Sequence, residues 1–192
     1  MSKEDQLQEL ESELLAADPT PELRQQAVQL VFGHGDVDAD ILFVGEAPGK
    51  QEDIHGQPFI GASGKFLDEM LATVGLERKE IYITNIVKYR PPKNRDPSKE
   101  EKQVMWPYLV RQIEIIKPKV VVTLGRHSGQ AFIKDLVIGD DHGQPKSVHG
   151  ILDGNDESII ILPLYHPAAA LYNGSLRAIL IEDFQTVANY IT

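Results

Sequence analysis

The sequence contains no cysteine among its 192 residues. This absence excludes disulfide bonds, thiolate nucleophiles, cysteine-ligated zinc and iron–sulfur clusters held by cysteine. The chain also lacks any apolar run that approaches the roughly 18 residues of a membrane helix. Its acidic start, MSKEDQLQELESE, lacks the basic flank of a secretion signal, so we expect a cytoplasmic protein without a membrane contact.

Positive charge is scarce overall but concentrated in one segment. The net charge is −10, and residues 1–22 carry seven acids against one lysine. Residues 88–102, KYRPPKNRDPSKEEK, carry six Lys or Arg against three acids. A chain this acidic is not expected to coat nucleic acid indiscriminately, but it can still offer a basic strip to phosphate groups.

The length and the 42% hydrophobic content suit one domain with one sizeable core. Four apolar runs rich in Ile and Val do not alternate with polar residues, which is typical of parallel strands covered on both faces. They span residues 41–44, 81–87, 120–124 and 158–164. Helical patterns follow them at 65–74, 98–116, 126–134 and 175–190. This alternation predicts an α/β fold, a three-layer αβα sandwich with right-handed crossovers.

Residues 1–30 form a helical extension in this interpretation, packed on a single domain of residues 31–192. Leucines at helical spacing predict a surface helix over 3–16, and a shorter helix is expected over 21–30. Ser98 with Glu101 fits a capping box, with Asp96-Pro97 as an alternative helix start. The polar stretch 138–158 reads as an edge hairpin.

Ligands bind at the carboxyl ends of the strands in such a sheet, so the loops that follow the four runs are the candidate site. They bring Glu46, Asn85 and His166, and Phe59 stands in a loop returning from the first of them. Each has an ordinary alternative: a carboxylate bound by backbone N–H groups, an amide bonded to a neighbouring loop, a surface or core histidine, and a core aromatic ring.

Other chemistries fit less well. GEAPGK has three residues between its glycines instead of the four of a phosphate loop, and Gln51 replaces the magnesium-binding Ser or Thr. The six histidines are scattered without a metal-binding spacing, so no metal is expected. An acid, a carboxamide, an imidazole and an aromatic wall instead match a pocket that stacks a planar base and reads its edge.

The chain resembles the uracil-DNA glycosylase superfamily, and most closely its family 4. The resemblance runs from about Val31 to the C-terminus through VFGHGDVDADILFVGEAPG, ED..GQPF.G.SGKFLD, GLERKEIYITNIVKYRPPKNRDPS.EE, PKVVVTLGR and YHPAA. It implies a four-stranded parallel sheet in the αβα sandwich. The implied roles are Glu46 as the catalytic carboxylate, His166 as donor to the charge developing on uracil O2, Phe59 as the stacking ring, Asn85 as the reader of the uracil edge, and the backbone of Gly45 and Ala47 as pocket lining.

The chain departs from the family in two places. Family 4 normally holds a [4Fe–4S] cluster with four cysteines, whereas alignment places Tyr89 and Met105 at the later pair and the region of Asp18 and Pro21 at the earlier pair. We therefore expect no cofactor, and propose that packing of Tyr89, Met105 and Trp106 replaces the cluster. The family's arginine after HPAA is also absent. The expected DNA-binding residues are Ser63, Lys65, Lys88, Arg90, Lys93, Arg95, Leu171 and Tyr172.

These features predict a monofunctional uracil-DNA glycosylase that flips uracil out of DNA, hydrolyses its N-glycosidic bond and leaves an abasic site. We expect a monomer whose partner is uracil-containing DNA. The alternative is a weak or silent relative that binds damaged DNA through the same pocket. A hydrolase of nucleotide phosphates, built on the glycine loops, is a third class that the failed phosphate-loop spacing disfavours.

Overall fold

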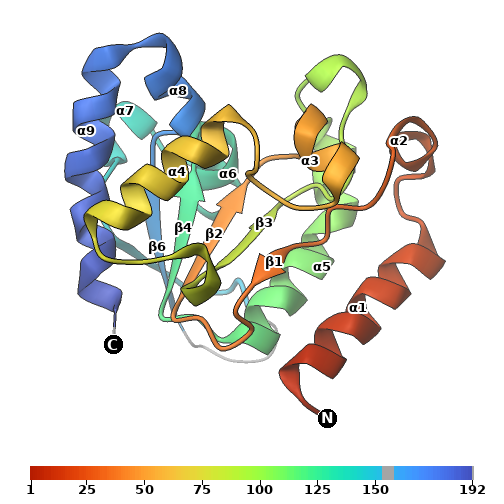
Figure 1. The fold of residues 1–192 in the computed structure, drawn as a ribbon. Coiled ribbons are helices and arrows are strands. Elements are labelled where there is room, and N and C mark those ends of the chain that lie inside the picture. Colours follow the sequence, from red (N-terminus) through yellow and green to blue (C-terminus); the bar gives the residue numbers. More distant parts are fainter. Residues whose placement is uncertain (153–157, 192) are drawn as a thin grey trace.

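The computed structural model describes residues 1–152 and 158–191, and a β-sheet lies between two layers of helices (Figure 1). The described chain forms six strands in the order β1-β3-β2-β4-β6-β5. Four of them are parallel neighbours: β3 (Tyr82–Asn85), β2 (Ile41–Gly45), β4 (Val120–Leu124) and β6 (Ile159–Leu164). The antiparallel edge strands are β1 (His34–Gly35) and β5 (Lys146–Val148).

The sheet therefore contains the four expected parallel strands, but it extends beyond them by one antiparallel strand at each edge. The sheet is mixed, because two short polar segments pair along its edges. Strands of two or three residues are too short to show a periodic pattern, and that is why the sequence did not reveal them. They also cover the backbone groups that an open edge would expose.

The central strands bury side chains on both faces, as their unbroken apolar runs predicted. Leu42 and Val44 of β2 face a core built with α1 (Lys3–Ala17) and α5 (Lys99–Ile116). Phe43 faces the opposite core, built with α4 (Ala62–Thr73) and α9 (Gly174–Phe184). There its ring stacks on Phe184, with ring centroids 5.8 Å apart. The sheet thereby holds the loops at its carboxyl edge on a rigid base.

Helix ends follow local hydrogen bonding. Ser98 and Glu101 form the predicted capping box, so α5 begins at Lys99 and the alternative start at Asp96-Pro97 is not used. The helix expected over 21–30 ends early, as α2 (Pro21–Gln26). Asp53 explains this end, because its carboxylate accepts the backbone N–H of Val28 at 2.8 Å and draws the chain away from the helical path.

Several shorter helices complete the described chain. They are α3 (Lys50–His55), α6 (Arg126–Phe132), α7 (Ile138–Asp141), α8 (Pro167–Tyr172), and the 3₁₀ turns η1 (Arg78–Glu80), η2 (Pro92–Asn94) and η3 (Gln185–Tyr190). Neither α3 nor α8 was expected, since six residues show little apolar periodicity. The hairpin expected over 138–158 includes residues 153–157, which lie outside the described residues. Of the helices described, none is both long and apolar enough to cross a membrane.

The parallel strands all end at one edge of the sheet, and their exits carry the candidate residues. Glu46 follows β2, Asn85 ends β3, Gly125 follows β4, and His166 lies two residues beyond β6. Helices α3 and α8 begin within a few residues of two of these exits. Four polar or glycine positions that are far apart in the sequence are thus brought together at one place.

Candidate active site

A small cavity of about 160 Å³ opens at this edge, and we call it the inner cavity. Its lining includes Ala47, Glu52, Phe59, Ser63, Asn85 and His166. The lining thus combines the exits of β2, β3 and β6 with α3 and the loop that precedes α4. The carboxamide, the imidazole and the aromatic ring predicted from the sequence all lie on its wall.

Asn85 presents an unsatisfied acceptor at this cavity. Its side chain is only 2% exposed, and its Oδ1 has no hydrogen-bond partner among the described residues. A Cβ added at Gly45 would lie 2.3 Å from this oxygen, so a side chain larger than glycine at position 45 would displace the amide. A buried acceptor without a partner costs about 1 to 3 kcal/mol, which a ligand N–H in the cavity would relieve.

Phe59 is held in a strained conformation beside the same cavity. Its φ of 54° lies in the left-handed region that residues with a Cβ seldom adopt. Arg78 holds the loop in this shape, because its guanidinium donates to the carbonyl oxygens of Phe59, Pro58 and Gly64. The Phe59 ring lies 5.7 Å from the His166 ring, tilted by 34°. Two rings therefore form adjoining walls.

His166 caps the N-terminus of α8 and has a defined tautomer. Its Nδ1 accepts the backbone N–H of Ala168 at 3.0 Å, so in the neutral ring the proton is on Nε2. Burial lowers the pKa of His166 to about 4, against a smaller opposing effect of the Glu52 carboxylate. The ring is consequently a neutral hydrogen-bond donor at physiological pH.

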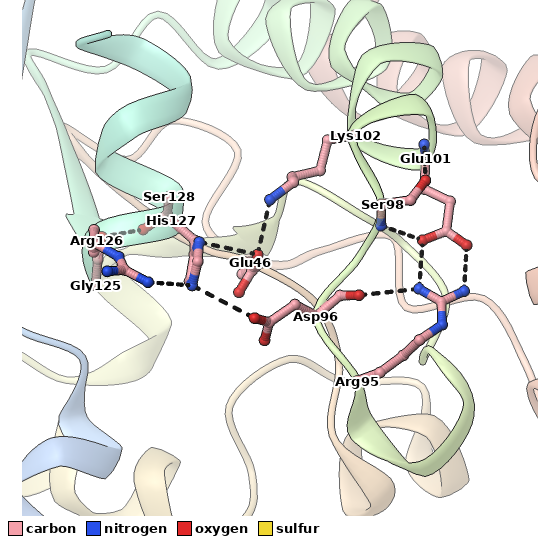
Figure 2. Close-up of polar contacts among 10 residues, drawn as sticks. All are labelled: Glu46, Arg95, Asp96, Ser98, Glu101, Lys102, Gly125, Arg126, His127 and Ser128. Carbon is pink, nitrogen blue, oxygen red and sulfur yellow. Dashed lines mark hydrogen bonds and ion pairs between the residues drawn. The ribbon is translucent and has the colours of Figure 1, made fainter. Parts of the chain in front are cut away.

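Glu46 lies in an adjoining cavity of about 470 Å³, which we call the outer cavity. The two cavities share Ala47, Gly49 and His166 in their walls. Lys102 of α5 donates to Glu46 Oε1 at 3.1 Å, and His127 Nδ1 of α6 is 3.8 Å from the same oxygen, as Figure 2 shows. The Glu46 side chain is 18% exposed. The carboxylate is thus held by two side chains beside the inner cavity.

Sequence reasoning missed four residues of this site. Lys102 and His127 hold Glu46, Arg78 holds the Phe59 loop, and Glu52 accepts the backbone N–H groups of Ile60 and Gly61 at 3.0 and 2.9 Å. The position of Lys102 one turn into α5 was readable from the capping box. Its partner was not, because 56 residues separate it from Glu46.

Comparison with known proteins agrees with this geometry. The family model of the uracil DNA glycosylase superfamily matches residues 32–189. The chain belongs to the uracil-DNA glycosylase superfamily. It is 45% identical to a type-4 uracil-DNA glycosylase of Sulfurisphaera tokodaii, over 95% of this chain and 84% of that protein. It is 37% identical to another from Thermotoga maritima, over 100% of this chain and 98% of that protein.

The structure corrects one expected DNA contact of this superfamily member. Lys88 is fully buried, and its Nζ lies 2.6 Å from Thr84 Oγ1, from the Asn85 carbonyl oxygen and from Gln112 Oε1. Burial holds the pKa of Lys88 well below its usual value. Because the side chain turns into the interior and binds three oxygens there, it cannot reach DNA. It braces the backbone of Asn85 instead.

The other expected DNA-binding residues lie at the surface or at the cavities. Ser63 lines the inner cavity, Lys65 and Lys93 are exposed, and Arg90 bonds Asn94. Arg95 lines the outer cavity, where Glu101 binds its guanidinium at 2.6 and 2.8 Å. Leu171 and Tyr172 of α8 are 44% and 91% exposed. A side chain as large as Tyr172 seldom stands this free of packing.

The residues that the resemblance aligns with the family's iron–sulfur ligands do not fit a cluster. Tyr89 and Met105 are 2% and 0% exposed and belong to the apolar core on the α5 side of the sheet. Neither side chain supplies a thiolate, and the chain has no cysteine elsewhere. Trp106 packs against this core, with its ring 5.0 Å from that of Phe132. Tyr89 and Met105 are thus packed in an apolar core.

Proposed function

We propose that this protein is a monofunctional uracil-DNA glycosylase that hydrolyses the N-glycosidic bond of a flipped deoxyuridine and leaves an abasic site. The observation that carries the proposal is the Oδ1 of Asn85, which has no partner within residues 1–152 and 158–191, in a cavity that is also lined by the neutral imidazole of His166. The two groups are complementary to the polar edge of a pyrimidine. The relatives named above carry the same activity in their descriptions.

Base recognition follows from the donor and acceptor pattern of this wall. Asn85 Oδ1 accepts the N3–H of uracil, and the amide nitrogen of the same side chain donates to O4. Cytosine has an unprotonated N3 and an amino group at that edge, so it opposes both hydrogen bonds. The Phe59 ring stacks on the base. Gly45 and Ala47 line the pocket with backbone, and the glycine leaves room for the amide.

Bond cleavage separates charge, and the site offers a partner to each charge. As the bond to C1′ breaks, negative charge develops on uracil O2, and His166 donates its Nε2–H to that oxygen. Positive charge develops on the sugar, beside the Glu46 carboxylate in the outer cavity, which also orients the attacking water. Lys102 is ion-paired with Glu46, and an ammonium has no free electron pair to form a Schiff base.

The wider DNA interface is part of the proposal. Lys65, Arg90, Lys93 and Arg95, the last of which lines the outer cavity, contact phosphates, and Leu171 or Tyr172 enters the gap left by the flipped base. The protein works as a monomer without a cofactor. Residues 1–30 form a helical extension on a single domain of residues 31–192, which is supported by the burial of Leu7, Leu10 and Leu14.

A uracil-excision assay tests this function. Oligonucleotides with one deoxyuridine, single-stranded and duplex, are incubated with wild type, Glu46→Ala and His166→Ala in the presence of a chelator. We expect abasic sites with wild type and rates at least about a hundredfold lower with each variant, since each removes one charge-stabilising group. Retained binding without release above the variants would support the alternative, a silent protein that binds damaged DNA.

A further inference from the structure

A third cavity, of about 560 Å³, has no role in the proposed chemistry. It lies between α5 and α6, and we call it the α5–α6 groove. Its lining includes Lys99, Lys102, Gln103 and Trp106 of α5, and His127 and Gln130 of α6. It is larger than the inner cavity that is proposed to hold the base.

The groove adjoins the outer cavity through a shared wall. His127 lines both spaces, and Lys102 lines the groove while its Nζ bonds Glu46 on the other side (Figure 2). The contact of Glu46 with Lys102 and His127 therefore separates the catalytic site from the groove. A strand whose flipped nucleotide occupies the inner and outer cavities therefore has the groove beside it, across His127 and Lys102.

The lining of the groove suits a nucleotide in charge and in shape. Lys99 contributes positive charge, the stem of Lys102 lines the wall while its ammonium is paired with Glu46, and Gln103 offers an amide that can donate and accept hydrogen bonds. Trp106 adds an indole ring, which is a sequence-tolerant surface for stacking a base. The ring packs edge-on against Phe132 at 66°, so its orientation is fixed before any ligand arrives.

We propose that the α5–α6 groove binds the nucleotide adjoining the flipped deoxyuridine in the same strand, with its base against Trp106 and its phosphate near Lys99 and Lys102. This subsite rests on the proposed function, because it requires the deoxyuridine to occupy the neighbouring cavities. A strand that fills the groove should therefore bind more tightly than a single deoxyuridine nucleotide, which cannot reach it. Recognition is of an unpaired nucleotide and independent of its base.

Charge favours a nucleotide over other occupants. The whole chain carries a net charge of −10, yet the residues that line the groove in the described part of the chain include Lys99 and Lys102 and no acid. A metal ion is disfavoured at the shared wall. The ligand atoms of Glu46, Asp96 and His127 lie within 4.8 Å of one another, but the Lys102 ammonium already binds that carboxylate.

Trp106 is the only tryptophan of the chain, so its fluorescence reports directly on the groove. The probes are a single nucleotide and trinucleotides whose deoxyuridine carries a 2′-fluorine, which resists cleavage by destabilising the sugar cation. We expect a trinucleotide to quench about half of the emission by stacking, and the single nucleotide to leave it unchanged. Two further trinucleotides carry an abasic spacer in place of only the 5′ or only the 3′ neighbour. The one that fails to quench shows which neighbour of the deoxyuridine stacks on Trp106.

A matched pair of variants tests the groove independently of fluorescence. Gln103→Glu places a carboxylate four residues after Lys99, where it pairs with that lysine and repels phosphate. Gln8→Glu makes the same change on the exposed surface of α1. We expect Gln103→Glu to raise KM for a single-stranded uracil oligonucleotide about fivefold, and Gln8→Glu to leave it unchanged.

Failure of the groove and failure of the proposed function are distinguishable. If wild type releases uracil while bound trinucleotide leaves Trp106 unquenched and both variants share one KM, the groove proposal is overturned and the enzyme assignment stands. If neither uracil release nor trinucleotide binding occurs, both are overturned. Equal quenching by a single nucleotide would also contradict the subsite, because the flipped nucleotide alone does not reach Trp106.

Discussion

At the residue scale, the proposed discrimination of bases depends on the Asn85 amide, whose backbone is held from the protein interior. Lys88 binds the carbonyl oxygen of Asn85 from the protein interior, while the side-chain Oδ1 of Asn85, which lines the inner cavity, has no partner in the part of the chain that the structure describes. The backbone is thus fixed on one side and the recognition group is free on the other. Such preorganisation lets the base gain the hydrogen bonds without a cost of ordering the amide.

Asn85→Leu removes both hydrogen bonds with little change of volume. We expect kcat/KM for uracil excision to fall about a hundredfold. This corresponds to about 3 kcal/mol of lost transition-state stabilisation, because the polar edge of uracil is left unpaired. Single-turnover kinetics on a single-stranded oligonucleotide measures it. An unchanged rate would show that Asn85 does not read the base.

His166 predicts a specific dependence of stability on pH. Its pKa in the folded protein is lowered to about 4, whereas an unfolded histidine titrates near 6.5. The unfolded chain therefore binds a proton that the folded chain does not, and the free energy of unfolding falls as the pH decreases from about 6.5 to about 4. With allowance for partial exposure, the expected loss is about 2 kcal/mol.

Urea unfolding of wild type and His166→Gln at pH 7, 6 and 5 measures this effect. The variant lacks the imidazole, so the wild-type stability should fall more steeply with decreasing pH than that of the variant. Parallel curves would mean that the imidazole titrates normally. Nitrogen NMR of wild type at pH 6 gives an independent check, since it should report a neutral ring with its proton on Nε2.

The loop from Gly56 to Gly61 matters most at the scale of the elements, because it carries Phe59 in a strained conformation. Arg78 of η1 is its brace, with contacts to three carbonyl oxygens and an ion pair with Asp68. Gly64 is required beside it, since a Cβ there would lie 1.6 Å from the Phe59 carbonyl oxygen. The aromatic wall is thus positioned by a residue outside the cavity.

Arg78→Met removes this brace while keeping the bulk of the side chain. We expect KM for uracil-containing DNA to rise about tenfold as the loop relaxes away from its strained φ, with a smaller effect on kcat. Lys79→Met is the matched control, because Lys79 is an exposed neighbour paired with Glu77. Equal kinetics for the two variants would contradict the positioning role of Arg78.

At the scale of the molecule, we propose that apolar packing replaces the iron–sulfur cluster of family 4. Tyr89 and Met105 lie inside one continuous apolar core with Leu14 of α1 and Leu109 of α5. Such a core needs no redox-sensitive ligand, so folding is expected to be independent of iron. The orphaned side-chain oxygens of Asp18 and Thr20 are buried polar atoms that this packing leaves without a partner among the described residues.

We expect purified protein to contain less than about a tenth of an iron atom per chain, and its melting temperature to be unaffected by chelator or oxidant. Metal analysis and calorimetry measure these quantities. Tyr89→Ala, which opens a cavity in the core, should lower the unfolding free energy by about 3 kcal/mol. Stoichiometric iron, or a stability that falls on chelation, would refute the replacement.

The sequence predicted those parts of the molecule that local patterns determine. Unbroken apolar runs located the four central strands, and the Ser98 capping box located the start of α5. Strand exits then brought Glu46, Asn85 and His166 to one region, with Phe59 on the loop that returns to it, although the two-cavity arrangement depends on three-dimensional packing. The partners of Glu46 were not predictable, because Lys102 and His127 approach from other elements. Lys88 was misassigned because charge alone suggests exposure.

Mass spectrometry of a single-stranded oligonucleotide with one deoxyuridine, incubated with the wild-type protein in chelator, tests the central claim most directly. The account predicts one free uracil per strand, and an intact strand in which a hydroxyl has replaced the base. No release of uracil at stoichiometric protein would contradict the account, and so would equal release by Glu46→Gln.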